Sequence, residues 1–250
     1  MIPNPIRKVL SSMQERRVRA LLMGGQACVL YGAAEFSRDI DLAILADPGN
    51  LVRLRTALSD LQAEVIAVPP LGPKHLRRGH AVHFRCMHPD ALRMRIDVMS
   101  KMRGLDIFPK LWTRRTTLIL PDGLSCNLMS LPDLVMAKKT QRDKDWPMIR
   151  RLLEANYFQH RTQPGSARIS FWLKELRTPE LLVEIAGNHP RPCRRMVATR
   201  PLLSAALAGE LREVERGLVE EEKAERERDR QYWALLRREL EFLRHSTRAS

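Results

Sequence analysis

The stretch from residue 21 to residue 45 constrains the fold of this 250-residue chain more than any other segment. It places Asp39 and Asp41 on either side of Ile40, and the residues that follow, 42–45, are all apolar. A short apolar run of this kind is typical of a strand buried in a sheet, and side chains alternate between the two faces of a strand. Both carboxylates must therefore point to the same face. Because unpaired charge on an apolar element is costly, we expect a cation between them.

A third aspartate has similar surroundings. Asp97 is the one acidic residue in the short apolar run from Met94 to Met99, which we interpret as another strand. If this strand pairs with the strand that carries Asp39 and Asp41, the three carboxylates converge, and oxygen ligands of this type suit Mg²⁺ or Mn²⁺. The sequence therefore predicts a metal site with these three aspartates as ligands. The loop residues that offer an alternative to Asp97 are Asp90 and Asp106.

Two motifs resemble a known family. Gly24-Gly25, a short helix starting at Gln26, and Ser37-Arg38-Asp39-Ile40-Asp41-Leu42 resemble the signature of the polymerase-β-type nucleotidyltransferase superfamily. That signature is a Gly-Gly or Gly-Ser turn, a helix, and Asp-x-Asp. The later segment 131–149 is similar to the Lys…Arg-x-Lys-Asp helix of the bacterial branch that contains AbiEii-like toxins.

The resemblance implies a fold, a reaction and a set of ligands. The fold is α+β, a mixed sheet flanked by helices, and the reaction moves an NMP from an NTP to a hydroxyl acceptor with release of pyrophosphate. Two Mg²⁺ or Mn²⁺ ions are expected on Asp39, Asp41 and Asp97, which are then the catalytic residues together with Lys138. The residues expected to contact the nucleotide are Gly24, Gly25, Gln26, Ser37, Arg38, Lys138, Lys139 and Arg142. Many family members have Gly-Ser where this chain has Gly25-Gln26, which leaves the backbone amides of the turn and helix to hold phosphate.

Lys138 is the first choice for the cation that neutralises the leaving group. Lys138, Arg142 and Asp145 fall at spacings of four and three, which places them on one face if the helix expected over residues 131–141 continues. A solvated helix face is the alternative interpretation, and Asp145 can equally be a helix N-cap before Trp146-Pro147. The reserve candidates are Lys139 and Lys144.

Periodicity predicts the order of the elements. Helices are expected over residues 5–17, 26–33, 48–62, 131–141 and 146–158, and strands over 19–24, 39–46, 64–68, 81–87, 94–100, 115–120 and 124–129. From Arg161 onward the pattern is wholly helical, with breaks at 162–165, 178–179 and 188–192. An apolar stripe that begins at Leu207 is interrupted by the highly charged residues 220–230, which favours a long helix that projects or binds a protein partner. We expect a catalytic domain over 1–160 and a helical region over 161–250.

The net charge of +14 favours polyanions, and RNA is the obvious candidate. Solvated surface charge is the alternative, and the aromatic content of 5% offers no evident platforms for stacking bases. The basic clusters are Lys74, Arg77 and Arg78 in a Gly/Pro-flanked loop, Arg93 with Arg95, Arg114 with Arg115, and Arg191 with Arg194 and Arg195.

The spacing of the cysteines and the length of the apolar runs indicate where in the cell the protein is located. The four cysteines are scattered and lack C-x-x-C spacing, so we expect buried thiols. No apolar run is long enough for a membrane span, and the N-terminal segment lacks a signal-peptide pattern, so we expect a cytoplasmic protein that does not bind membrane. His80, His83 and His88 lie near one strand, and we interpret them as surface or core histidines in preference to a metal triad.

Three functions compete at this stage. The first is a nucleotidyltransferase whose acceptor is RNA, with a tRNA 3′ end implied by the resemblance to toxin-type members. The second is the same chemistry on a protein hydroxyl or on a small molecule such as an aminoglycoside, although a cationic acceptor is disfavoured by the basic charge. The third is a non-catalytic RNA-binding or antitoxin-like adaptor. The presence of all three aspartates argues against it.

Overall fold

The computed structural model describes residues 3–248, which form two compact units. The sheet unit comprises the residues up to 30, residues 34–137 and the residues from 232 on. The helical unit comprises residues 31–33 and 138–231.

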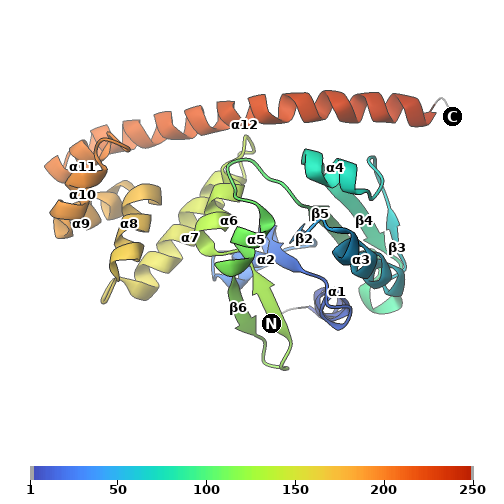
Figure 1. The fold of residues 1–250 in the computed structure, drawn as a ribbon. Coiled ribbons are helices and arrows are strands. Elements are labelled where there is room, and N and C mark those ends of the chain that lie inside the picture. The colour runs from blue at the N-terminus through green and yellow to red at the C-terminus, as the bar shows by residue number, and fades with distance from the viewer. Residues whose placement is uncertain (1–2, 249–250) are drawn as a thin grey trace. The chain divides into compact units, whose positions relative to one another are not determined.

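The sheet unit contains a mixed seven-stranded sheet in the order β3-β4-β5-β2-β1-β7-β6 (Figure 1). Its strands are β1 (Ala20–Met23), β2 (Asp39–Ile44), β3 (Ala63–Val65), β4 (Val82–Cys86), β5 (Arg95–Met99), β6 (Thr116–Ile119) and β7 (Ser125–Leu128). The pairs β2–β5 and β1–β7 are parallel, and the other four pairs are antiparallel. Six of the seven strands lie within segments predicted from the sequence, and β3 begins one residue before the segment predicted over 64–68. The predicted α+β class with a mixed sheet is confirmed.

The two faces of this sheet differ in polarity. Ile40, Leu42, Phe84, Ile96 and Val98 are buried. The residues between or beside them that are charged or polar and at least partly exposed are Asp39, Asp41, His83, Arg85, Arg95 and Asp97. This alternation is typical of a sheet that packs one face on the core and leaves the other in contact with water. The polar face is where the predicted aspartates lie.

Helices complete the sheet unit. They are α1 (Asn4–Glu15), α2 (Gly24–Leu30), α3 (Pro48–Asp60), α4 (Pro73–Arg78), α5 (Phe108–Thr113) and α6 (Leu131–Lys138), with a short 3₁₀ turn over Pro89–Ala91. On α3 the predicted apolar stripe is buried at Leu51, Leu54 and Leu58. Asp47 caps this helix by accepting a hydrogen bond from the Asn50 amide at 2.9 Å.

The prediction that Lys74, Arg77 and Arg78 lie in a loop is wrong, because they lie on α4. Pro73 occupies the first turn of this helix, where its missing N–H is tolerated, and Gly79 ends it with φ 108°. A helix of six residues is too short to give a periodic pattern in the sequence.

The helical unit begins with α7 (Asp145–His160) and continues with four short helices: α8 (Ser166–Glu175), α9 (Pro179–Asn188), α10 (Pro190–Met196) and α11 (Leu203–Ala208). The predicted breaks at 162–165 and 178–179 lie where α7 gives way to α8 and α8 to α9. The break predicted over 188–192 is shorter, since α10 already begins at Pro190, and the break between α10 and α11 was not predicted. Tyr157 and Trp172 pack edge to face with ring centroids 4.8 Å apart, and the Trp172 indole donates to Asn156 Oδ1 at 2.9 Å. Buried Arg200 donates to the carbonyl oxygens of Leu173 and Leu176, which satisfies the end of α8.

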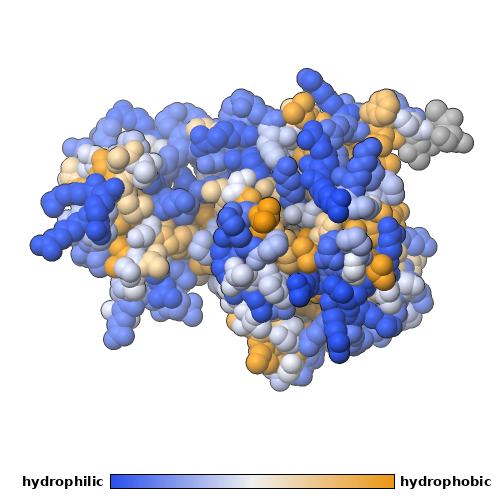
Figure 2. Space-filling model, in the orientation of Figure 1, coloured by the Kyte–Doolittle hydropathy of each residue, from blue (hydrophilic) through white to orange (hydrophobic). Residues whose placement is uncertain are grey.

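The C-terminal helix α12 (Leu211–Arg248) is a single helix of 38 residues, as the interrupted stripe predicted. Its charged middle carries pairs at spacings of three and four, among them Lys223–Glu220 and Arg230–Glu227. Figure 2 shows that hydrophilic side chains cover most of the face in view, which agrees with the high charged fraction of the sequence. Among residues 3–248, no helix has both the length and the apolar composition that crossing a bilayer requires.

Candidate functional site

The aspartates of the sheet unit occupy adjacent positions on its polar face. In the parallel pair β2–β5, Asp41 lies opposite Asp97, and Asp39 lies opposite Arg95. Residues that are paired across neighbouring strands share a face, and so do residues two apart on one strand. Asp39, Asp41 and Asp97 therefore share one face, which we call the acidic face. The strand pairing on which the predicted convergence depended is present.

The glycine turn packs directly against Asp41. Gly24, with φ +66°, is the first residue of α2, and a Cβ built on it would lie 1.8 Å from Asp41 Oδ2. A Cβ on Gly25 would lie 2.6 Å from Ser37 Oγ, and this hydroxyl donates to the Asp39 carbonyl oxygen at 3.2 Å. The two glycines are thus required by close approach, since each makes room for a side chain that leads into or belongs to the acidic face.

Asp97 Oδ1 has two hydrogen-bonding partners. His83, opposite Asp97 on β4, places Nδ1 2.8 Å from Asp97 Oδ1, and Arg95 Nε donates to the same oxygen at 2.8 Å. Burial raises the pKa of Asp97, but the hydrogen bonds and charges of His83 and Arg95 outweigh it, and the pKa is lowered below its ordinary value. Asp97 is therefore a carboxylate at neutral pH.

Arg95 supplies the cation that the sequence requires among these acids. Its hydrogen bond to Asp97 raises its pKa, and the negative charges of Asp97, Asp39 and Asp41 act in the same direction. From the sequence, Arg95 was expected in a basic cluster and not as a partner of Asp97. The sequence nevertheless contained evidence for this contact, because the spacing Arg95-x-Asp97 on a strand puts both side chains on one face. The contact of His83 depends on the pairing of β4 with β5, which the sequence does not show.

The acidic face brings carboxylates together, and carboxylate oxygens are the donor type that Mg²⁺ and Mn²⁺ prefer. Asp97 uses one oxygen, Oδ1, for both of its contacts, and Asp41 offers a second carboxylate at the adjacent register position. As they stand, however, no three His, Cys, Asp or Glu side chains between residues 3 and 248 are already grouped as a metal site.

The three histidines have different partners. His80 Nε2 lies 2.8 Å from Glu239 Oε2, His83 contacts Asp97, and His88 accepts a hydrogen bond from the Asp90 amide at 3.1 Å. They act as separate surface or core residues, which agrees with their interpretation from the sequence.

The predicted cluster around Lys138 is assembled by a turn in the helical unit. The expectation that a helix continues past Lys138 is wrong: α6 ends there, and the Thr140 amide donates to the Lys138 carbonyl oxygen at 2.7 Å. Lys138 Nζ donates to Asp145 Oδ1 at 3.2 Å, and Arg142 Nε donates to Asp145 Oδ2 at 2.8 Å. Thr140 Oγ1 donates to this second oxygen at 2.6 Å, so side-chain bonding of Thr140 replaces the next helical turn.

Asp145 is buried at the first position of α7, while Lys144 occupies the N-cap. Burial raises the pKa of Asp145, but the charge of Lys138 and the hydrogen bond from Thr140 prevail and lower it. Lys139 has a separate partner, since its Nζ lies 2.6 Å from Glu175 Oε2 with both side chains buried. Burial lowers the pKa of Lys139 despite the attraction of Glu175.

The remaining candidate residues differ in exposure. Gln26 is buried, and its Nε2 has no acceptor among residues 3–248. Ser37 is partly exposed, and Arg38 is exposed with its guanidinium 5.9 Å from the ring centroid of Phe36. Phe36 is itself 62% exposed. The aromatic ring of Phe36 and the cation of Arg38 thus lie on the loop that precedes β2.

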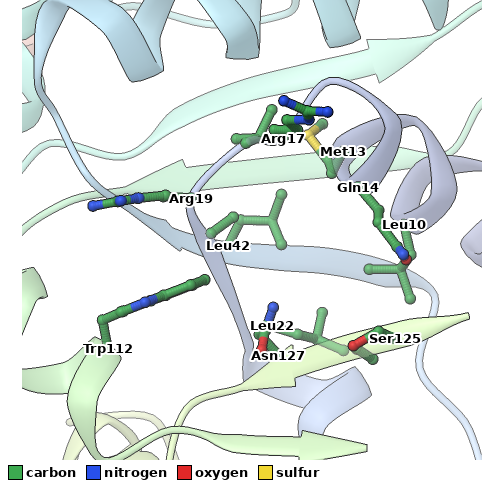
Figure 3. A pocket seen from close by; sticks show the side chains of 13 residues that line it. Leu10, Met13, Gln14, Arg17, Arg19, Leu22, Leu42, Trp112, Ser125 and Asn127 are labelled. Atoms are coloured by element: carbon green, nitrogen blue, oxygen red, sulfur yellow. The ribbon is translucent and has the colours of Figure 1, made fainter. Parts of the chain in front are cut away.

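A cavity of about 350 Å³ lies between the end of α1, the residues that follow it, and β7 (Figure 3). Leu42 lines this cavity together with Leu22, Trp112 and Asn127. Because Leu42 directly follows Asp41 on β2, it points to the opposite face of the strand. The cavity is therefore separate from the acidic face.

Comparison with known proteins adds no assignment: no family model matches the chain, and no curated protein matches it significantly.

Proposed function

We propose that this protein is a metal-dependent nucleotidyltransferase with a nucleotidyltransferase-type fold, and that the acidic face is its catalytic centre. The observation that carries the proposal is a single arrangement. Asp41, in Asp39-Ile40-Asp41, packs against the Gly24 turn, and Asp97 stands opposite Asp41 on the neighbouring parallel strand. A glycine turn at a helix start beside carboxylates on one face is the arrangement that transfer from a nucleoside triphosphate requires.

In this proposal the acceptor hydroxyl forms a bond to the α-phosphorus of the NTP. The bond to the β-phosphate breaks, pyrophosphate leaves, and the proton of the hydroxyl passes to solvent. Asp39, Asp41 and Asp97 hold Mg²⁺ or Mn²⁺, which neutralises phosphate charge and lowers the pKa of the acceptor hydroxyl. Arg95 and His83 keep Asp97 ionised and oriented.

The other predicted contacts to the nucleotide belong to the same proposal. The backbone amides at Gly24 and Gly25, at the start of α2, hold phosphate oxygens. Ser37 and Arg38 approach the nucleotide from the loop before β2. The buried Nε2 of Gln26 needs an acceptor, since an unsatisfied buried amide costs about 1–3 kcal/mol.

RNA is the acceptor that the charge of +14 favours, and a tRNA 3′ end is the form that the resemblance implies. A cytoplasmic location follows from the same substrates. The adaptor alternative has one observation in its favour, because Arg95 and His83 already occupy Asp97 Oδ1. It predicts RNA binding without turnover.

A labelling experiment separates these functions. The protein is incubated with each α-labelled NTP, Mg²⁺ or Mn²⁺, and either total RNA or total protein, and the labelled product is identified. We expect label on RNA, its loss in Asp41→Asn, and full activity in the control Asp90→Asn, whose carboxylate lies in the exposed turn before β5. Absence of label with every nucleotide on every acceptor contradicts the proposal, as does full turnover by Asp41→Asn.

A further inference from the structure

The polar face of the sheet unit continues beyond the acidic face across β4 to the edge strand β3. Arg95 lies opposite Arg85 on β4, and Arg85 lies opposite Glu64 on β3. Since paired residues share a face, these side chains form one row with Asp39, which is opposite Arg95. The row thus leads from the acidic face toward the β3 edge and carries two arginines.

A hollow of about 570 Å³ lies at this edge. The residues that line it are Glu64, Ile66, Arg85, Met87 and Arg93, and we call it the edge hollow. Ile66 and Met87 are 39% and 45% exposed, which gives the hollow an apolar part beside its charges. Arg93 reaches it from the turn between β4 and β5, where its amide donates to the Cys86 carbonyl oxygen at 2.8 Å.

The two arginines of the edge hollow differ from Arg95 in their partners. Arg95 is bound to Asp97, whereas neither Arg85 nor Arg93 forms an ion pair with any acidic side chain of residues 3–248. Both are exposed, and Glu64 lies opposite Arg85 without pairing to it. Two unpaired guanidinium groups beside an apolar surface suit phosphate groups, which arginine binds through paired N–H donors.

We propose that the edge hollow binds the single-stranded end of an acceptor RNA whose terminal hydroxyl reaches the acidic face. This inference rests on the proposed function. Two strand spacings separate β2 from β4, about 10 Å, which is close to three nucleotides at about 3.4 Å each in a stacked strand. Arg85 and Arg93 bind backbone phosphates, while Ile66 and Met87 contact an unpaired base. The Glu64 carboxylate accepts a hydrogen bond from a base amino group or a 2′-hydroxyl.

The test measures RNA binding in the absence of chemistry. A short single-stranded RNA with a free 3′ end and a 5′ fluorophore is titrated with the full-length protein in EDTA without NTP, at several KCl concentrations. Fluorescence anisotropy gives the slope of log K against log[KCl]. This slope is negative, and for single strands each phosphate contact contributes about 0.7 to its magnitude. Arg85→Gln and Arg93→Gln should therefore each make the slope less steep by about 0.7, and the double variant by about 1.4.

Two further variants make the result specific. Arg85→Lys keeps the charge and retains the wild-type slope. Arg55→Gln is the matched control, because Arg55 is exposed on α3 and its only described partner is the Leu71 carbonyl oxygen at 2.8 Å. We expect this control to bind as the wild type does, which would exclude a general effect of net charge.

The outcomes separate this inference from the proposed function. A slope unchanged in the double variant overturns the inference even if label transfer to RNA succeeds, and so does a wild-type protein that fails to bind the RNA. Competition by polyglutamate as effective as that by unlabelled RNA also overturns it, in favour of an acidic protein. A reduced slope without any transfer supports the RNA site and contradicts only the catalytic proposal.

Discussion

The contact between Gly24 and Asp41 yields the sharpest test of how the acidic face is built. In Gly24→Ala the new methyl group would lie 1.8 Å from Asp41 Oδ2, 2.4 Å from its Cγ and 2.7 Å from its Cβ. Rotation of the Asp41 side chain can move Oδ2 and Cγ but leaves Cβ in place, since β2 fixes its position between β1 and β5. The backbone must therefore shift as well.

Two terms set the magnitude. An alanine at φ +66° costs roughly 1–2 kcal/mol relative to glycine because of its left-handed conformation. Overpacking of a well-packed site adds about 1–3 kcal/mol. We expect Gly24→Ala to lower the free energy of unfolding by about 2–5 kcal/mol, measured by urea denaturation followed by circular dichroism.

Gly123→Ala is the matched control, because Gly123 lies in the sheet unit at φ +84° with nothing within 4 Å of a built Cβ. Gly123→Ala therefore measures only the cost of alanine in a left-handed backbone conformation, roughly 1–2 kcal/mol. In an Asp41→Ala background the clash with Oδ2 and Cγ disappears, so Gly24→Ala should cost at least about 1 kcal/mol less there than in the wild type. Equal costs for Gly24→Ala and Gly123→Ala, or an unchanged cost in the Asp41→Ala background, refute the packing argument.

Three other predictions concern the charged groups. Asp41→Asn should leave the thermal midpoint unchanged or raise it, because it relieves repulsion among clustered carboxylates; a large drop in calorimetry would show that Asp41 stabilises the fold. The lowered pKa of Asp97 stabilises the folded state above the unfolded-state value of 3.8, and this contribution is lost as pH falls through the folded-state pKa. The stability difference between wild type and Asp97→Asn, from urea unfolding at each pH, should thus be full at neutral pH and vanish in acid, whereas a pH-independent difference would exclude an ionised Asp97. Lys139→Met should lower the free energy of unfolding by about 3–5 kcal/mol, because it leaves Glu175 buried and unpaired. The double variant Lys139→Met with Glu175→Leu should have nearly the wild-type stability. Equal losses of stability in the single and double variants would mean that the pair is not isolated from water.

Local patterns were enough to locate most elements. Every strand of the described chain overlaps a predicted segment, although β3 begins one residue before its segment, because alternation of apolar and polar residues is a property of a few consecutive positions. At the start of α6, Ser130 and Asp133 have the spacing of a helix cap, and the Asp133 amide donates to Ser130 Oγ at 3.4 Å. Short elements were missed, such as α4, since one and a half turns give no periodic signal.

Other features depended on contacts that the sequence does not display. The helix over 131–141 was predicted too long because Thr140 bonds to Asp145, a competition decided by the fold of the turn. The expected division at residue 160 also differs from the compact units, which divide at residue 137 and again within α12. From Tyr232 on, α12 belongs to the sheet unit, where Glu239 receives hydrogen bonds from Arg78 and lies beside His80.

The sequence by itself determined that Asp39 and Asp41 share a face, because the two-residue period of a strand leaves no other arrangement. It also indicated where the strands lie, to within a residue or two at their ends. The tertiary structure alone decided that β5 is the parallel neighbour of β2, and with it that Asp97 faces Asp41 and that Arg95 and His83 hold its carboxylate. The physical reason is that pairing joins segments far apart in the chain, and its register is set by packing of the buried face and not by any local pattern.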